Sequence, residues 1–385
     1  MKRILLFLAL ILILFLIASL LLMKQDRTEL KTHFDVTDIL GESVTAGFEK
    51  ADIVREFSFP RDHGPHPDFQ SEWWYFTGNA ANPAGERFGF QFTLFRSALT
   101  PDSLRRTSAW ATNQIYMAHF TVTDAAANRF YFFERFSRGA PGLAGAQAQP
   151  FRIWLENWSA HSGSADFIDS TTTLQIDCEA DPVRASLTLT NKKPVALHGN
   201  RGLSQKGEDA GNASYYYSLT RLAVRGEIAI DEKQHPVVGS AWLDREWSTS
   251  ALGQDQVGWD WFSLQLDNGW DVMFYRIRRR DGSIDRFSHG TLIDPKGRYR
   301  PLSLRQVALD VLDYWDSPGS ARYPSGWRLR VPDAQLDVTV TPLIKNQELN
   351  ATIRYWEGAV RVQGSQAGAP LQGHGYVELT GYSHL

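Results

Sequence analysis

The chain has 385 residues, of which 43% are hydrophobic and 22% are charged, and its formal net charge is −3. This composition is typical of a globular protein with enough chain for two domains. The nearly balanced charge provides no electrostatic attraction to nucleic acid. The aromatic content is high, with 13 Trp, 13 Tyr and 22 Phe. Because aromatic side chains favour pleated strands and the walls of apolar cavities, the composition favours β structure.

The N-terminus has the pattern of an export signal. Lys2 and Arg3 precede a largely apolar run from residue 4 to residue 23, which is long enough to span a bilayer as a helix. No clear small-x-small cleavage site ends this run, so we expect an uncleaved anchor over residues 1–24, with a cleaved signal and secretion as the alternative. The positive flank should stay in the cytoplasm, which predicts a protein anchored in the inner membrane and facing the periplasm.

The chain after the anchor changes character twice. Residues 25–55 are polar and mixed in charge, as expected of a tether. The remaining chain is rich in β-branched and aromatic segments bounded by turn signals, and helical periodicity is weak. Representative segments are residues 88–96, 115–122, 129–135 and 270–277. Many short strands in regular order predict a β-sandwich or a β-barrel.

The same unit occurs twice, with its landmarks in the same order. Residues 236–246 align with residues 370–380 at the end of each copy. The paired positions are Asp244 with Glu378, Trp242 with Tyr376, Trp74 with Trp261, and His119 with His289. A period this long indicates duplicated domains and not a solenoid of short repeats. We therefore predict one domain over residues 56–248 and a second over residues 249–385.

Several motifs together resemble those of one protein family. They are Ser71-Glu-Trp-Trp-Tyr-Phe-Thr-Gly78, Met117-Ala-His-Phe120, Gly202-Leu-Ser-Gln-Lys-Gly207, Ala213-Ser-Tyr-Tyr-Tyr217 and Trp242-Leu-Asp-Arg-Glu-Trp247. They resemble the AttH/carotenoid 1,2-hydratase (hydroxyneurosporene synthase) family, over essentially the whole chain after the tether. The resemblance implies an all-β fold of two consecutive lipocalin-like antiparallel β-barrels, here behind an N-terminal membrane helix. Many members are exported proteins of unknown activity, often associated with ABC transporter systems.

The hydratase branch of this family suggests a catalytic trio. Its chemistry is attributed to an aspartate and an aromatic residue two positions apart on one strand, with a second aromatic upstream. Carried over by motif, these residues are Asp244, Trp242 and Tyr217. Residues two apart on a strand face the same side, so we expect Asp244 and Trp242 to share a cavity inside the first barrel, large enough for a long hydrocarbon. The strand aromatic is usually Tyr, and Trp242 has no hydroxyl group to relay a proton.

The residue types of this trio suit the hydration of an alkene. A carboxyl group that is buried among aromatics has a raised pKa and can remain a proton donor near neutrality. Electron-rich ring faces can then stabilise the carbocation until water attacks it. The alternative is a purely structural role, in which the same side chains close the rim of the barrel by hydrogen bonding to neighbouring backbone groups.

Five further residues are candidates for contact with a ligand. They are Glu72, Trp74, His119, Lys206 and Glu246. Several of these residues also have a purely structural interpretation. Glu72 could cap loop amides, and the recurrence of His119 as His289 suggests a structural hydrogen bond. Glu246 could form an ion pair at the barrel rim. Metal ligands do not cluster at a recognisable spacing, and no nucleophile elbow, phosphate loop or dinucleotide fingerprint occurs. We therefore predict neither a metal nor another cofactor.

Three classes of function are compatible with these observations. The first is an exported, membrane-tethered protein that binds a terpenoid, carotenoid or lipid ligand and acts with an ABC transporter. The second is an enzyme, either a carotenoid 1,2-hydratase-like hydro-lyase or an isomerase or cyclase. The third is a structural envelope protein. The N-terminal anchor favours the first class, in which the partners are a hydrophobic small molecule and the membrane.

Overall fold

The computed structural model describes residues 46–101, 108–163, 173–250, 252–253 and 255–382. The anchor expected at residues 4–23 and most of the tether lie outside these ranges, so both stay predictions. Within the described ranges, no helix is both long and apolar enough to cross a bilayer. The helical elements there are the short 3-10 segments η1 (Arg61–His63), η2 (Leu304–Gln306) and η3 (Pro332–Ala334). The prediction of an all-β fold is therefore confirmed.

The first of two antiparallel sheets has 13 strands. They are β1 (Ser71–Ala81), β2 (Arg87–Ala98), β3 (Gln114–Asp124), β4 (Arg129–Arg138), β5 (Ala144–Ala148), β6 (Phe151–Leu155), β7 (Trp158–Ser162), β8 (Thr173–Ala180), β9 (Val183–Asn191), β10 (Ala196–Leu197), β11 (Leu203–Gln205), β12 (Ala213–Ile230) and β13 (Lys233–Ser250). The strands follow the order β4-β3-β2-β1-β13-β12-β9-β8-β7-β6-β5, with β10 and β11 paired to β12.

The second sheet has 10 strands. They are β14 (Gln256–Leu266), β15 (Asp271–Arg279), β16 (His289–Ile293), β17 (Tyr299–Ser303), β18 (Ala308–Asp316), β19 (Arg322–Val331), β20 (Leu336–Pro342), β21 (Glu348–Asn350), β22 (Arg354–Gln366) and β23 (Ala369–Leu379). Their order is β17-β16-β15-β14-β23-β22-β20-β19-β18, with β21 paired to β22.

Both barrel-like sheets repeat one strand order. In each sheet, four strands follow one another in sequence, and the first of them pairs with the last strand of the sheet, β13 or β23. Three further strands then follow the penultimate strand in matching order. Asp244 and Glu378 therefore lie on corresponding strands, as the internal repeat predicts. The domain boundaries at 56–248 and 249–385 stay a prediction.

The strand register corrects one aligned pair of the repeat. Asp244 lies opposite Tyr75, and Glu378 lies opposite Trp261. Trp261 therefore corresponds to Tyr75, and the predicted pairing of Trp261 with Trp74 is wrong by one residue. Because side chains alternate along a strand, a shift of one residue moves a side chain to the other face of the sheet.

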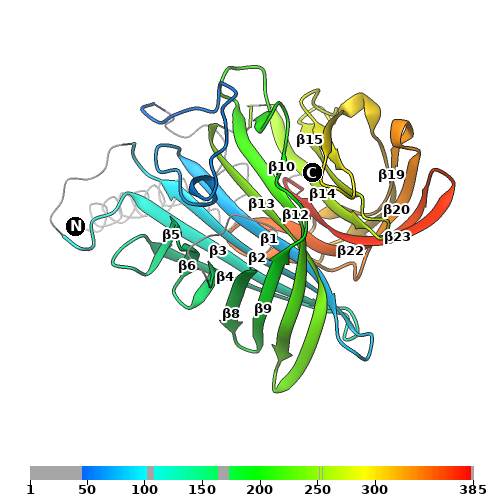
Figure 1. The fold of residues 1–385 in the computed structure, drawn as a ribbon, viewed down its shortest axis with the longest axis horizontal. Helices are drawn as coiled ribbons and strands as arrows, with labels where there is room; N and C mark the ends of the chain where they lie inside the picture. Colours follow the sequence, from blue (N-terminus) through cyan, green and yellow to red (C-terminus); the bar gives the residue numbers. More distant parts are fainter. Residues whose placement is uncertain (1–45, 102–107, 164–172, 251, 254, 383–385) are drawn as a thin grey trace, which may run out of the picture. The chain divides into compact units, whose positions relative to one another are not determined.

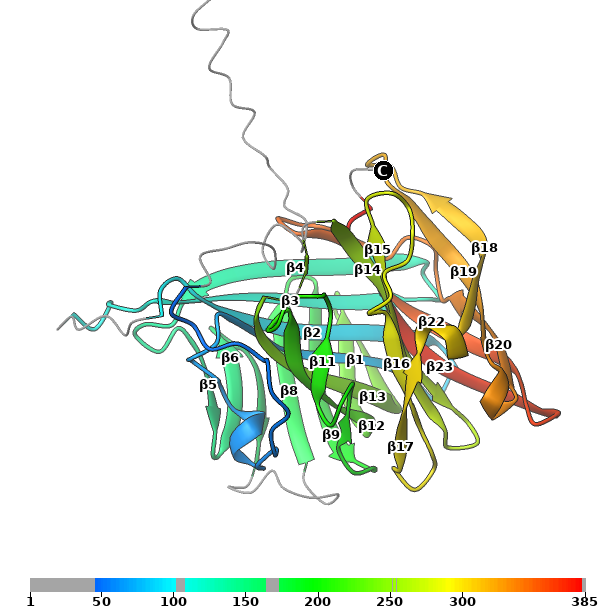
Figure 2. The same ribbon diagram turned by 90° about the horizontal axis from the view of Figure 1, so that it is seen from above.

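Each sheet encloses an apolar core, and a third cluster joins the two sheets. Trp74 and Leu243 belong to the core of the first sheet, and Phe262 belongs to that of the second. The third cluster draws on both sheets and includes Tyr75, Tyr216, Trp242, Trp261 and Tyr376. The outward faces of β1, β12 and β13 therefore pack against the second sheet, whose strands are drawn in yellow-green to red (Figure 1, Figure 2).

Corresponding residues make the contact between the sheets twice. The side-chain amide of Asn79 donates to the carbonyl oxygen of Gly375 at 2.8 Å. The side-chain amide of Gln265 donates to the carbonyl oxygen of Ala241 at 2.9 Å. In the corrected register, Asn79 corresponds to Gln265 and Ala241 to Gly375. The two hydrogen bonds are therefore reciprocal, as in the contact between two subunits related by a two-fold axis.

Candidate functional site

A cavity of about 60 Å³ lies between the two sheets. The first sheet contributes Trp73, Tyr75, Tyr216 and Asp244 to its wall, and the second contributes Trp259, Trp261, Tyr355 and Glu378. The expectation that Asp244 faces the interior of the first barrel is wrong. Ala241 and Leu243 occupy that interior, so the alternate residues Trp242 and Asp244 face the second sheet. The cavity is also too small for the long hydrocarbon that we expected.

Three hydrogen-bond donors surround the carboxyl group of Asp244. The Tyr216 hydroxyl donates to Oδ2 at 2.5 Å, the Trp242 indole donates to Oδ1 at 2.6 Å, and the Ser218 hydroxyl also donates to Oδ1. Burial raises the pKa of Asp244 to about 7, against the opposing effect of these three donors. The carboxyl group therefore holds a proton in part of the molecules near neutrality. Trp242 lacks a hydroxyl group, but its indole N–H still contacts the acid.

A second layer of contacts fixes these donors. The Trp261 indole donates to the Tyr216 hydroxyl at 3.0 Å. His198 Nε2 lies 2.5 Å from the Ser218 hydroxyl, and His198 Nδ1 lies 2.8 Å from the Thr291 hydroxyl. Burial lowers the pKa of His198 well below its ordinary value, so the ring is neutral. Trp261 and Thr291 come from the second sheet, which therefore helps to orient the acid of the first.

The second sheet contributes two carboxyl groups of its own. Glu357 and Glu378 lie opposite each other on the neighbouring strands β22 and β23. The Tyr75 hydroxyl donates to Glu357 at 2.6 Å, and the Trp259 indole donates to Glu378 at 2.6 Å. Burial raises the pKa of Glu378 to about 7 and that of Glu357 well above its ordinary value. Two adjacent carboxyl groups resist ionising together, so this pair holds a proton.

A fourth carboxyl group is already neutralised. Glu246 forms an ion pair with Lys206 and accepts a hydrogen bond from the Ser214 hydroxyl. The Lys206 ammonium also lies 5.2 Å from the centre of the Tyr275 ring. Among the residues that the structure describes, no group of His, Cys, Asp and Glu side chains is suited to hold a metal ion. The cavity therefore offers proton donors and acceptors among aromatic rings.

Comparison with known proteins identifies the family. A family model described as AttH-like matches residues 50–382. The chain belongs to the AttH-like family. The crystal structure of AttH (NE1406) from Nitrosomonas europaea superposes with a TM-score of 0.76 at 34% identity, covering 87% of this chain and 100% of that one. No curated protein matches the sequence.

Two more distant structures share the fold of this AttH-like protein. Kievitone hydratase from Nectria haematococca superposes with a TM-score of 0.65 at 16% identity, covering 88% of this chain and 98% of that one. CghA with Sch210972 has a TM-score of 0.50 at 15% identity, covering 82% and 89% of the two chains. At these identities, the likeness shows the fold alone.

Tyr217 lies on the other face of its strand from the cavity. Its hydroxyl is 2.6 Å from Nδ1 of His63, and its ring packs against Phe59 and Trp247. The hydroxyl that contacts Asp244 belongs instead to Tyr216. The motif Tyr215-Tyr216-Tyr217 gives no choice between these neighbours. In the corrected register, the counterpart of Tyr355 is Tyr216.

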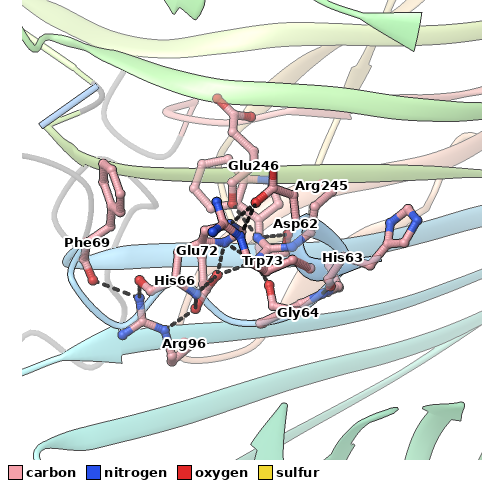
Figure 3. A network of polar contacts seen from close by, with 12 residues as sticks. Asp62, His63, Gly64, His66, Phe69, Glu72, Trp73, Arg96, Arg245 and Glu246 are labelled. Carbon is pink, nitrogen blue, oxygen red and sulfur yellow. Dashed lines mark hydrogen bonds and ion pairs between the residues drawn. The ribbon is translucent and has the colours of Figure 1, made fainter. Parts of the chain in front are cut away.

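Glu72 and Trp74 do not line this cavity: Trp74 belongs to the core of the first sheet, and Glu72 lies in a separate network of polar contacts (Figure 3). The Glu72 carboxylate accepts hydrogen bonds from Arg96, Arg245 and the backbone N–H of His66. Burial alone would raise the pKa of Glu72, but the two guanidinium groups and His66 hold it well below its ordinary value. The Arg245 guanidinium lies 3.9 Å from the centre of the Trp74 ring. This network fastens the segment before β1 to the first sheet.

His119 bridges the two sheets. Its Nδ1 atom lies 2.6 Å from the Tyr355 hydroxyl of the second sheet, and its Nε2 atom lies 3.0 Å from a carboxylate oxygen of Glu134 on β4. The other Glu134 oxygen accepts from the backbone N–H of Thr352 at 3.0 Å. His119 is fully buried. It therefore positions Tyr355, which lines the cavity, and connects it to a partly exposed carboxylate.

Proposed function

We propose that this AttH-like protein binds a compact apolar ligand between its two sheets and protonates it with Asp244, in a hydratase- or isomerase-type reaction. The observation that carries this proposal is a set of three carboxyl groups where the two sheets meet: Asp244 and Glu357 are buried, and the half-buried Glu378 lines the aromatic cavity together with Asp244. Within the described chain, none of the three forms an ion pair with Lys or Arg. Burying an uncompensated acid is unfavourable, and such perturbed groups cluster at functional sites.

The geometry supports a division of roles between the two walls. Protonated Asp244 gives its proton to an alkene carbon, which forms a C–H bond and leaves a carbocation beside the ring faces of Trp259 and Trp261. Water then attacks the cation, and its surplus proton passes to the ionised carboxylate of Glu378. Exchange with water returns both groups to their starting states. Loss of a proton from the cation, in place of water attack, would give an isomerised alkene.

Two further considerations support this assignment. A carrier of hydrocarbons needs apolar walls, but it has no use for three acids that destabilise the fold when ionised. Kievitone hydratase, which shares the fold, is named for a hydration reaction. For the cellular setting, we propose from the N-terminal sequence that the protein is anchored in the inner membrane and faces the periplasm, and from the family resemblance that it acts with an ABC transporter. N-terminal sequencing of the native protein tests the anchor.

The experiment uses the full chain in detergent with a panel of compact unsaturated terpenoids, such as myrcene and linalool, in isotopically labelled water. Wild-type protein should transfer labelled oxygen or hydrogen to a substrate, as detected by mass spectrometry. Asp244→Asn should bind the same compound without turnover, because an amide keeps the shape of the acid but cannot donate the required proton. The matched control is Asp285→Asn, which changes a buried aspartate outside the cavity lining. Turnover by Asp244→Asn would contradict the role of Asp244 as the acid. Binding without turnover by wild-type protein would show that the protein acts as a carrier of the ligand and not as an enzyme.

A further inference from the structure

A second cavity, of about 170 Å³, adjoins the first. Trp73, Phe95 and Tyr355 line both cavities, so these three side chains form a shared wall. The larger cavity is therefore not an isolated packing defect. A molecule that occupied it would lie directly beside the acids of the first cavity.

The walls of the second cavity are a continuous apolar surface. Phe95, Met117 and Phe136 lie opposite one another across β2, β3 and β4. Ile115 adds to this surface, and Ile353, which directly precedes β22 of the second sheet, closes it. Residues that are paired across strands in this way form one face. The cavity is thus built from both sheets, as the first one is.

The ionisable side chains that line this cavity already have partners. Both ring nitrogens of His119 are hydrogen bonded, and Glu72 and Arg96 form an ion pair with each other. A charged ligand group would find no counter-ion here, and its desolvation would not be compensated. The lining therefore selects an uncharged, apolar group.

The size of the cavity limits the size of the apolar group that it can hold, and one of its lining residues shows where the group can enter. An engineered apolar cavity of roughly 150 Å³ in another protein stays dry and binds benzene, so a volume of about 170 Å³ suits a single ring or a short branched hydrocarbon. Phe136 lines the cavity and is 50% exposed. It lies on β4, at the edge of the first sheet. The cavity therefore opens to solvent at this edge.

We infer that the second cavity binds the apolar part of the ligand, a group about the size of one ring or a short isoprenoid unit. The ligand enters at the β4 edge, and its reactive end passes the shared wall of Trp73, Phe95 and Tyr355 to reach Asp244. The inference rests on the proposed function for the role of the reactive end. Binding of the apolar group itself requires no chemistry at Asp244.

The test uses toluene and naphthalene as probes, with benzoate as the charged analogue of toluene, and isothermal titration of the full chain in detergent. Wild-type protein should bind toluene saturably and benzoate far more weakly. Ile353→Trp should fill the cavity and weaken toluene binding by about tenfold or more. Leu312→Trp is the matched control, because Leu312 is exposed on β18 and outside the cavity. Asp244→Asn should bind toluene as wild-type protein does.

A second variant keeps the test decisive if Ile353→Trp does not fold. Ile353→Ala enlarges the cavity, so it should shift the preference from toluene toward naphthalene. Absence of saturable toluene binding by wild-type protein would overturn the inference, as would an unchanged preference in a folded Ile353→Ala protein. These results are independent of turnover. Loss of turnover in Asp244→Asn together with unaltered probe binding in the Ile353 variants would uphold the proposed function and reject the second cavity as a ligand site.

Discussion

The pKa of Asp244 makes a quantitative prediction about stability. In the unfolded chain this carboxyl group has its ordinary pKa of 3.8, whereas burial in the folded protein raises the pKa to about 7. Between these two values the unfolded chain loses the proton and the folded protein keeps it. Folding stability therefore falls as the pH rises through this window and levels off above it. Asp244→Asn removes the titrating group, so the variant should gain stability relative to wild-type protein over the same window.

The expected size of the effect follows from the two pKa values. One pKa unit corresponds to about 1.4 kcal/mol, and the pKa of Asp244 rises from 3.8 to about 7 on folding. Across this pH window, the unfolding free energy of Asp244→Asn should therefore increase by roughly 4 kcal/mol relative to that of wild-type protein. No allowance for solvent screening is needed, because Asp244 is only 3% exposed. Glu378 titrates in a similar range, but it is present in both proteins, so its contribution largely cancels.

Urea unfolding at several values between about pH 4 and about pH 8 measures this difference. Asp285→Asn is the control, because Asp285 is buried but its pKa is lowered. Burial alone would raise that pKa, but hydrogen bonds from Gln256, the backbone of Phe287 and Arg279 outweigh it. The stability that Asp285 contributes is lost only as the pH falls below about 4, so the control should show a constant difference from wild type. A constant difference for Asp244→Asn as well, or one of the opposite sign, would refute the reasoning.

Four further substitutions test other parts of the site. Tyr216→Phe removes a donor to Asp244 and should reduce turnover or ligand affinity by about tenfold, whereas Tyr217→Phe should lower stability by about 1 kcal/mol and leave ligand binding intact. Lys206→Met leaves the buried Glu246 without its cation, so the unfolding free energy, measured by urea unfolding, should fall by about 3–5 kcal/mol. Arg245→Met removes one of two guanidinium groups from the buried Glu72 carboxylate and should speed proteolytic cleavage within the segment before β1.

Each of these variants has its own control. Equal effects of the two tyrosine substitutions on ligand binding would show that the structure assigns the wrong hydroxyl to the acid. The double variant Lys206→Met/Glu246→Gln should recover most of the lost stability, because it removes both charges. A double variant as unstable as Lys206→Met would contradict the ion-pair argument. For Arg245→Met, unchanged cleavage before β1 alongside normal folding would mean that the network does not fasten this segment.

Part of this site could be predicted from the sequence, because strand geometry is local. The spacing of Trp242 and Asp244 places both side chains on one face, and the structure joins them by a hydrogen bond. The face itself could not be assigned in this way, because an apolar core lies on one side of the strand and an aromatic contact on the other. Both sides contain Trp and Tyr, so hydrophobicity does not distinguish them.

Other parts depend on pairing between distant strands. The choice of Tyr216 over Tyr217 requires the register of β12 against β13, which includes a bulge between Leu219 and Leu222. Glu357 gave a usable signal, since it is an acidic residue within a long apolar strand pattern. Its pairing with Glu378, however, is set by strands that lie side by side only in the folded sheet.

The reciprocal hydrogen bonds between the sheets have a consequence for how this site can change. In a symmetric dimer of identical subunits, the same surface of each subunit forms the contact, so both walls of a site between them have the same residues. In this protein both walls belong to one polypeptide, so a substitution alters one wall and spares the other. Asp244 faces Ser218 across its strand pair, while the corresponding positions hold Glu378 and Glu357. Joining the copies has thus permitted different residues at these corresponding positions, an acid opposite a serine on the first wall and two acids opposite each other on the second, which a symmetric dimer of identical chains could not present.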